Sequence, residues 1–132
     1  MSDLFRRCLV SGGVLGGVAV AAGAFGAHGL KGILEAAGQT GNWETASRYA
    51  LAHAVVLVAV GAVAARPESS PARGLLAAAA WSFLLGSLVF SGCLATLALT
   101  GVKMLGAIVP VGGGLLIVGW ACLAIAAFRI GR

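Results

Sequence analysis

Two histidines and one tyrosine are the side chains of this sequence best suited to acid–base or ligand chemistry. His28 lies in the stretch GAFGAHGLKG, and Thr45, Tyr49 and His53 follow one another at intervals of four residues. Residues four apart lie on the same face of a helix, so these last three share one face. We call His28, Thr45, Tyr49 and His53 together the polar seam.

The polar seam has three interpretations. Because histidine titrates near neutral pH, the seam could relay a proton or form a pH-sensitive hydrogen bond. It could instead be structural, with Tyr49 and His53 donating to helix-end carbonyls or across to neighbouring helices. Finally, His28 and His53 could bind a metal or a haem, but two histidines without nearby thiolates or carboxylates make an incomplete metal site. Haem ligation would also need the two rings on opposite faces of the porphyrin, so we expect no metal and no cofactor.

No catalytic constellation accompanies the polar seam. The serines lack a partnered histidine and aspartate, and no paired carboxylates could act as acid and base. The stretches GGVLGG and PVGGG lack the strand and the lysine of a phosphate-binding loop. Cys8, Cys93 and Cys122 have no CxxC or Cys–His spacing, which favours packing roles. The sequence therefore predicts a protein that is not an enzyme and has no catalytic residues.

The composition places these residues in a membrane protein. The chain is 60% hydrophobic and only 10% charged, which is too apolar for an ordinary soluble domain. Four stretches carry no charged residue, and each is close to the roughly 20 residues that a membrane-spanning helix needs. They lack the alternation of a membrane barrel. We therefore predict an all-α, integral membrane four-helix bundle with glycine-rich packing, in a single transmembrane domain of residues 1–132 with helices at about 5–29, 43–65, 72–99 and 104–128.

The connection after the first helix has an amphipathic pattern. Ile33 and Leu34 lie beside the charged Lys31 and Glu35. This pattern predicts a short helix lying in the membrane interface, at about residues 32–38.

Basic residues are divided unequally between the two ends of the predicted bundle. Six arginines fall at the end that holds both termini, whereas only Lys31, Arg48 and Lys103 fall at the other. The positive-inside rule then predicts cytoplasmic N- and C-termini. The arginines flank the spans and form no patch with interleaved aromatic residues, so we expect no nucleic-acid partner.

Glycines are the most frequent candidates for helix packing. Gly12 with Gly16, and Gly13 with Gly17, form two overlapping GxxxG pairs, which let helix backbones approach closely in lipid. Further along the chain a proline and neighbouring glycines predict a kink and a close approach of the fourth helix. The candidate helix-packing residues are Gly12, Gly13, Gly16, Gly17, Gly23, Gly26, Pro110, Gly112 and Gly113.

Four motifs occur in a fixed order along the chain. They are GAFGAHGL, the W-x-T-A-x-x-Y-x-x-x-H pattern of residues 43–53, LVFSGCLATLAL, and VPVGGGLLIVGW. Together they resemble the bacterial inner-membrane family called "domain of unknown function 423", which has small eukaryotic transmembrane relatives. The resemblance implies a four-helix integral membrane protein with no established biochemical activity. The motif residues carried over are Gly23, Phe25, Gly26, His28, Trp43, Thr45, Tyr49, His53, Ser91, Gly92, Pro110, Gly112, Gly113 and Trp120.

These observations favour a multi-pass protein of the bacterial inner membrane that works by packing. It would be a non-enzymatic accessory subunit or a homo-oligomer, with membrane lipid and other membrane-protein subunits as its partners. The first alternative is a proton-coupled or small-solute transport or channel component that uses the polar seam. It would have to be an oligomer, because four helices with so little polar lining leave no room for a wet path. The second alternative is a haem- or metal-binding membrane subunit.

Overall fold

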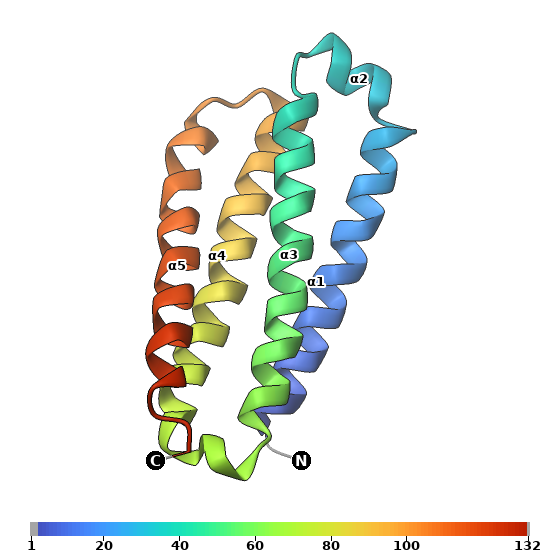
Figure 1. The fold of residues 1–132 in the computed structure, drawn as a ribbon. Coiled ribbons are helices and arrows are strands. Elements are labelled where there is room, and N and C mark those ends of the chain that lie inside the picture. Colours follow the sequence, from blue (N-terminus) through green and yellow to red (C-terminus); the bar gives the residue numbers. More distant parts are fainter. Residues whose placement is uncertain (1–2, 132) are drawn as a thin grey trace.

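The computed structural model describes residues 3–131, and this part of the chain folds entirely into helices and their connections (Figure 1). Four of the helices are long and apolar enough to cross a membrane, which confirms the predicted all-α membrane fold. In chain order the elements are α1 (Asp3–Ala27), α2 (Lys31–Ala36), α3 (Thr40–Ala64), the 3-10 helix η1 (Pro67–Ala72), α4 (Arg73–Thr100) and α5 (Met104–Ala127).

The ends of the long helices lie close to the predicted positions. Two differences are an earlier start of α3 and a short helix in the connection between α3 and α4. The helix α3 begins at Thr40 rather than at residue 43, and Asn42 in its first turn donates a hydrogen bond from Nδ2 to Oε1 of Gln39 at 2.7 Å. The α3–α4 connection is wound into η1, where the buried Ser69 hydroxyl donates to the Val63 carbonyl at 2.7 Å. The short helix α2 (Lys31–Ala36) lies close to residues 32–38, where the sequence predicts a short helix, and its place in the membrane interface stays a prediction.

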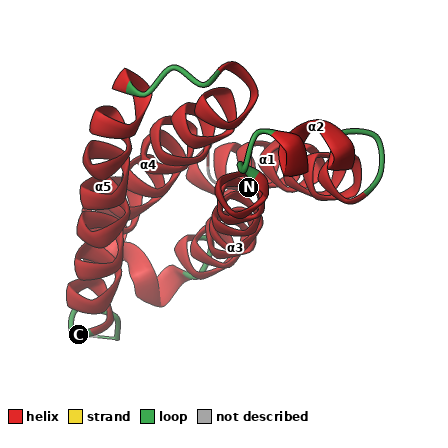
Figure 2. Cartoon of the chain, turned by 90° about the horizontal axis from the view of Figure 1, so that it is seen from above, coloured by secondary structure: helices red, strands yellow, loops and turns green. Residues whose placement is uncertain are grey.

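The four long helices pack in the order α1, α3, α4, α5 (Figure 2). The helix α1 packs mainly on α3 and α5 mainly on α4, while α1 hardly contacts α4. The two middle helices are the most buried: in their most apolar stretches, 39% of the α3 residues and 33% of the residues in the η1–α4 span are buried inside the bundle. The corresponding shares are 22% for α1 and 17% for α5. The bundle is therefore an open row in which α1 and α5 turn most of their surface outward.

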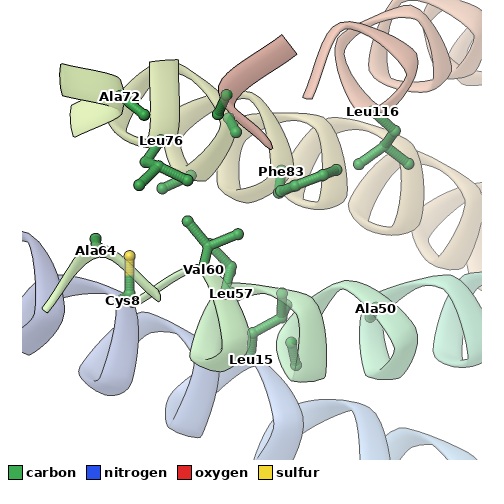
Figure 3. Packing of buried hydrophobic residues seen from close by; sticks show 14 of the residues in the cluster. Cys8, Leu15, Ala50, Leu57, Val60, Ala64, Ala72, Leu76, Phe83 and Leu116 are labelled. Carbon is green, nitrogen blue, oxygen red and sulfur yellow. The ribbon is translucent and has the colours of Figure 1, made fainter. Parts of the chain in front are cut away.

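The main core lies between α3 and its two neighbours (Figure 3). Phe83 and Leu76 of α4 are fully buried, and Leu57 of α3 is 1% exposed. Cys8 of α1 and Leu116 of α5 extend this core to the outer helices. Most of the remaining core positions are alanines, whose small side chains let the helix axes come close.

A second cluster closes the end of the bundle that carries α2. Leu34 of α2 is fully buried and packs with Trp43 of α3 and Ala98 of α4. The helix α2 is thus anchored to the bundle by one side chain. At the same end Gly101 ends α4 with a left-handed backbone (φ 70°), and its N–H donates to the Leu97 carbonyl at 2.8 Å.

Both ends of the described chain lie at the opposite end of the bundle from α2 (Figure 1).

Candidate functional site

His53 is the one residue of the polar seam that is fully enclosed by the bundle. It lies midway along α3 and is 6% exposed. Its Nδ1 is 2.8 Å from the carbonyl oxygen of Tyr49, one turn earlier, and its Nε2 is 3.3 Å from the indole nitrogen of Trp120 on α5. Both ring nitrogens are therefore engaged within the protein.

These two contacts define the proton position on His53. A carbonyl oxygen only accepts hydrogen bonds, so Nδ1 must carry the proton that it donates to Tyr49. An indole N–H only donates, so Nε2 must be the unprotonated acceptor of the bond from Trp120. The geometry therefore fits the tautomer that carries a proton on Nδ1. A metal ion at Nε2 would have to displace the Trp120 indole.

Aromatic rings surround His53 on three helices. The Tyr49 ring stacks on Phe90 of α4 with centroids 4.6 Å apart, and Phe83 meets Trp120 edge to face at 5.2 Å. The His53 imidazole lies 5.5 Å from the Phe83 ring and 6.2 Å from the Trp120 ring. We call Tyr49, His53, Phe83, Phe90 and Trp120 the aromatic cluster. Phe83 and Phe90 could not be predicted from the sequence, because no spacing rule links residues on separate helices.

The other two members of the polar seam do not join this cluster. His28 directly follows α1, is exposed, and within residues 3–131 makes no side-chain hydrogen bond, ion pair or ring contact. Thr45 is half-buried on α3, and its hydroxyl makes no hydrogen bond in the same part of the chain. The structure therefore joins Tyr49 to His53 and leaves His28 apart from them.

Metal-binding side chains do not gather in the described chain. Between residues 3 and 131 no three His, Cys, Asp or Glu side chains come together as a group that could hold a metal ion. Cys8 is buried, Cys93 and Cys122 are partly buried, and all three are free thiols.

Three of the candidate glycines on α1 face α3. A Cβ on Gly12 would lie 2.9 Å from the Ala54 carbonyl oxygen and 2.8 Å from Cγ2 of Val58, and one on Gly16 would touch Ala54 at 3.5 Å. A Cβ on Gly26 would overlap the Trp43 indole, whose Nε1 donates to the Ala22 carbonyl at 2.8 Å. These glycines let α1 lie directly on α3.

The remaining candidate glycines of α1 face away from the bundle. A Cβ on Gly13, Gly17 or Gly23 would meet no atom within 4 Å. Val10 and Val20 are each about 60% exposed and continue the row formed by Gly13 and Gly17 at intervals of three and four residues. We call Val10, Gly13, Gly17, Val20 and Ala24, all exposed, the outward α1 stripe.

The candidate packing residues of α5 also differ in how closely they contact the neighbouring helix. Gly112 faces α4, where a Cβ would overlap the backbone of Phe90, whereas a Cβ on Gly113 would only touch the Phe90 ring at 3.7 Å. Pro110 is exposed, and α5 continues through it.

Close approaches also occur at isolated glycines that no GxxxG pattern marks. A Cβ on Gly61 would lie 2.7 Å from Cβ of Cys8, one on Gly86 would lie 2.8 Å from Leu116, and one on Gly119 would lie 2.7 Å from the Phe83 ring. Gly61, Gly86 and Gly119 could therefore not be predicted as packing residues from the sequence.

Two cavities lie along the cleft between α1 and α4. The larger, of about 470 Å³, has Arg6 and Arg7 at its edge and Trp81 in its wall, and we call it the basic cavity. The smaller, of about 170 Å³, is bordered by Ser87 and Ser91 of α4 and is called the serine cavity. Both serine hydroxyls are buried, and neither has a hydrogen-bond partner among residues 3–131.

Taken together, the helices and the site define a small integral membrane protein in which Trp43 and Trp120 donate hydrogen bonds between helices. Residues 22–113 match the family model described as "Protein of unknown function (DUF423)", and the chain belongs to this family.

Several bacterial proteins are similar in sequence to this chain over most of its length. The chain is 40% identical over 113 residues to a "UPF0382 membrane protein" of Staphylococcus saprophyticus, covering 86% of this chain and 89% of the relative. A similarly named protein of Staphylococcus epidermidis is 40% identical and one of Staphylococcus aureus 38% identical, each over 112 residues, 85% of this chain and 87% of the relative. No solved structure matches the chain significantly.

Proposed function

We propose that this protein is a non-enzymatic component of the bacterial inner membrane that acts by self-association through the outward α1 stripe. The observation that supports this role is the orientation of two adjacent glycines. Gly12 is in close contact with α3, whereas Gly13 and Gly17 face open space. The pair Gly12 and Gly16 thus packs on α3 inside the bundle, whereas the equivalent pair Gly13 and Gly17 lies on its surface.

The composition of the outward stripe favours a helix as its occupant. Small residues four apart form a shallow groove that lets a second helix backbone approach closely, and such packing stabilises helix pairs in lipid. The row has the same spacing as the residues with which α1 packs on α3, namely Cys8, Gly12, Leu15 and Ala19.

A second copy of the chain fits this stripe best. Two copies inserted in the same orientation place their α1 helices parallel, which is the arrangement of GxxxG dimers. A two-fold axis along the membrane normal would then bring Gly13 and Gly17 of each copy against the same residues of the other. The proposed unit is a parallel homodimer with its termini in the cytoplasm, as the distribution of arginines predicts.

The alternative functions have less structural support. A proton pathway through the polar seam needs a free ring nitrogen on His53, and both of its nitrogens are engaged. A metal or haem bound by His28 and His53 would require the same nitrogen and a second histidine that lies exposed beyond the end of α1. The homodimer requires no rearrangement of the described residues.

The test is the oligomeric state of matched glycine variants in mild detergent and in lipid nanodiscs. We expect a dimer for the wild type and a monomer for Gly13→Leu/Gly17→Leu, measured by native mass spectrometry and single-molecule photobleaching. Gly114→Leu is the control, because Gly114 is also an open glycine but lies on α5. A monomeric wild type, or a dimer that survives the double substitution, would contradict the proposal.

A further inference from the structure

The basic cavity combines an apolar floor with a charged edge. The helices α1 and α4 both pack on α3 but hardly contact each other (Figure 2). The basic cavity lies between them, and Leu57 of α3 is part of its lining. Leu4 of α1 and Leu84 of α4 are also in the lining. The volume of about 470 Å³ falls within the range of roughly 300–1,000 Å³ that is usual for ligand pockets.

The charged edge holds a cation without an acidic partner. Arg6 forms an exposed pair with Asp3 at 3.6 Å. Arg7, in the second turn of α1, has no Asp or Glu within 4.0 Å in the part of the chain that the structure describes. An unpaired guanidinium beside an apolar groove favours an anionic ligand with a hydrophobic body, because the guanidinium matches a phosphate with two parallel hydrogen bonds.

Trp81 gives a second indication of a ligand. The indole N–H of Trp43 donates to the Ala22 carbonyl, and that of Trp120 donates to His53. The Trp81 indole N–H, in the wall of the basic cavity, makes no hydrogen bond within residues 3–131, and the residue is 50% exposed. A tryptophan of a membrane protein can place its apolar ring in lipid and offer its N–H to a polar group.

We propose that the basic cavity binds an anionic diacyl phospholipid from the leaflet at the end of the bundle that holds the termini. Arg7, with Arg6 beside it, binds the phosphate. Trp81, which lies in the third turn of α4, donates from its indole nitrogen to an ester carbonyl of the lipid. One acyl chain lies on Leu57 and Leu84. Val10 lines the basic cavity and also begins the outward α1 stripe. Gly13 and Gly17 are not part of the cavity lining, and the lipid contacts of Arg7 and Trp81 do not require the proposed homodimer.

The first test compares lipids and arginines by native mass spectrometry of the full chain. We expect the wild type to retain dioleoyl phosphatidylglycerol about tenfold more tightly than dioleoyl phosphatidylcholine, because both lipids carry a phosphate but the choline cation of the second offsets its charge. Arg6→Gln/Arg7→Gln should abolish this preference. Arg66→Gln/Arg129→Gln is the matched control, because it removes the same charge at the same end of the bundle without touching the cavity lining. Equal losses in the two double variants would show general attraction to anionic lipid and overturn the site.

The second test measures contact with Trp81 directly, through quenching of tryptophan fluorescence by brominated lipids in nanodiscs. Brominated phosphatidylglycerol should quench the wild type more than brominated phosphatidylcholine does, and Trp81→Phe should remove that difference. Equal quenching by the two lipids in the wild type, or a difference that persists in Trp81→Phe, would overturn the proposal. The Trp81→Phe substitution changes no hydrogen bond of the described chain, so the variant is expected to fold.

Discussion

The indole nitrogen of Trp120 on α5 donates a hydrogen bond to Nε2 of His53 on α3 at 3.3 Å, joining two helices that otherwise hardly touch. The Phe83 ring of α4, which lies between these helices in the row, contacts both rings. A buried imidazole is costly unless both nitrogens are paired, and here the second partner is the Tyr49 carbonyl. Two of the residues that suggest proton or ligand chemistry in the sequence, Tyr49 and His53, therefore take part in the packing of α3 against α4 and α5.

Replacing Trp120 with Phe should destabilise the bundle. The change removes the donor to His53 and leaves a buried nitrogen unpaired, so we expect the free energy of unfolding to fall by about 1–3 kcal/mol. The measurement is an SDS-unfolding titration in detergent without added anionic lipid. Trp81→Phe provides the matched control, because that indole makes no hydrogen bond within the described chain and its loss should cost much less. Equal losses in the two variants would argue against a structural role for the Trp120–His53 bond.

The sequence was sufficient to predict the four membrane-spanning helices and the shared helix face of Tyr49 and His53. Gaps in charge mark each membrane helix, and the interval of four residues places Tyr49 and His53 on one face. Their partners Phe83 and Trp120 could not be found in this way, because helical periodicity says nothing about which helices are neighbours. The same limit applies to His28, which has the side-chain chemistry of His53 but lies exposed just beyond the end of α1.

The glycines of α1 show a related limit. The two GxxxG pairs are one residue apart and so differ by about 100° around the helix axis. The sequence identifies both pairs as close-packing surfaces but does not say which of them meets α3. Only the packed bundle separates Gly12 and Gly16, which contact α3, from Gly13 and Gly17, which do not.

Alanine substitutions at two adjacent glycines should separate folding from assembly. In Gly12→Ala the new Cβ would lie 2.9 Å from the Ala54 carbonyl oxygen, which belongs to the rigid backbone of α3. We expect this overpacking to lower the free energy of unfolding by about 1–3 kcal/mol. Gly13→Ala meets no atom within 4 Å and should leave the stability of the monomer unchanged or raise it by up to about 1 kcal/mol, because alanine favours the helix more than glycine does.

Both glycine variants are compared by SDS unfolding at a protein concentration low enough to keep the chain monomeric. A large loss in Gly13→Ala under these conditions, or none in Gly12→Ala, would mean that α1 is rotated differently on α3. That result would also remove the structural basis for the outward α1 stripe.

Substitution of the buried serines should distinguish hydroxyls that are paired from those that are not. The Ser69 hydroxyl donates to the Val63 carbonyl, so Ser69→Ala loses a hydrogen bond and should lower the free energy of unfolding by about 1 kcal/mol. The Ser87 hydroxyl is equally buried but has no partner among residues 3–131. Burying an unpaired hydroxyl costs about 1–3 kcal/mol, so Ser87→Ala should raise the stability by about 1 kcal/mol. Thermal unfolding in detergent measures both changes. A loss of stability in Ser87→Ala would contradict the prediction, because it would show that this hydroxyl is hydrogen-bonded to a polar partner in the serine cavity.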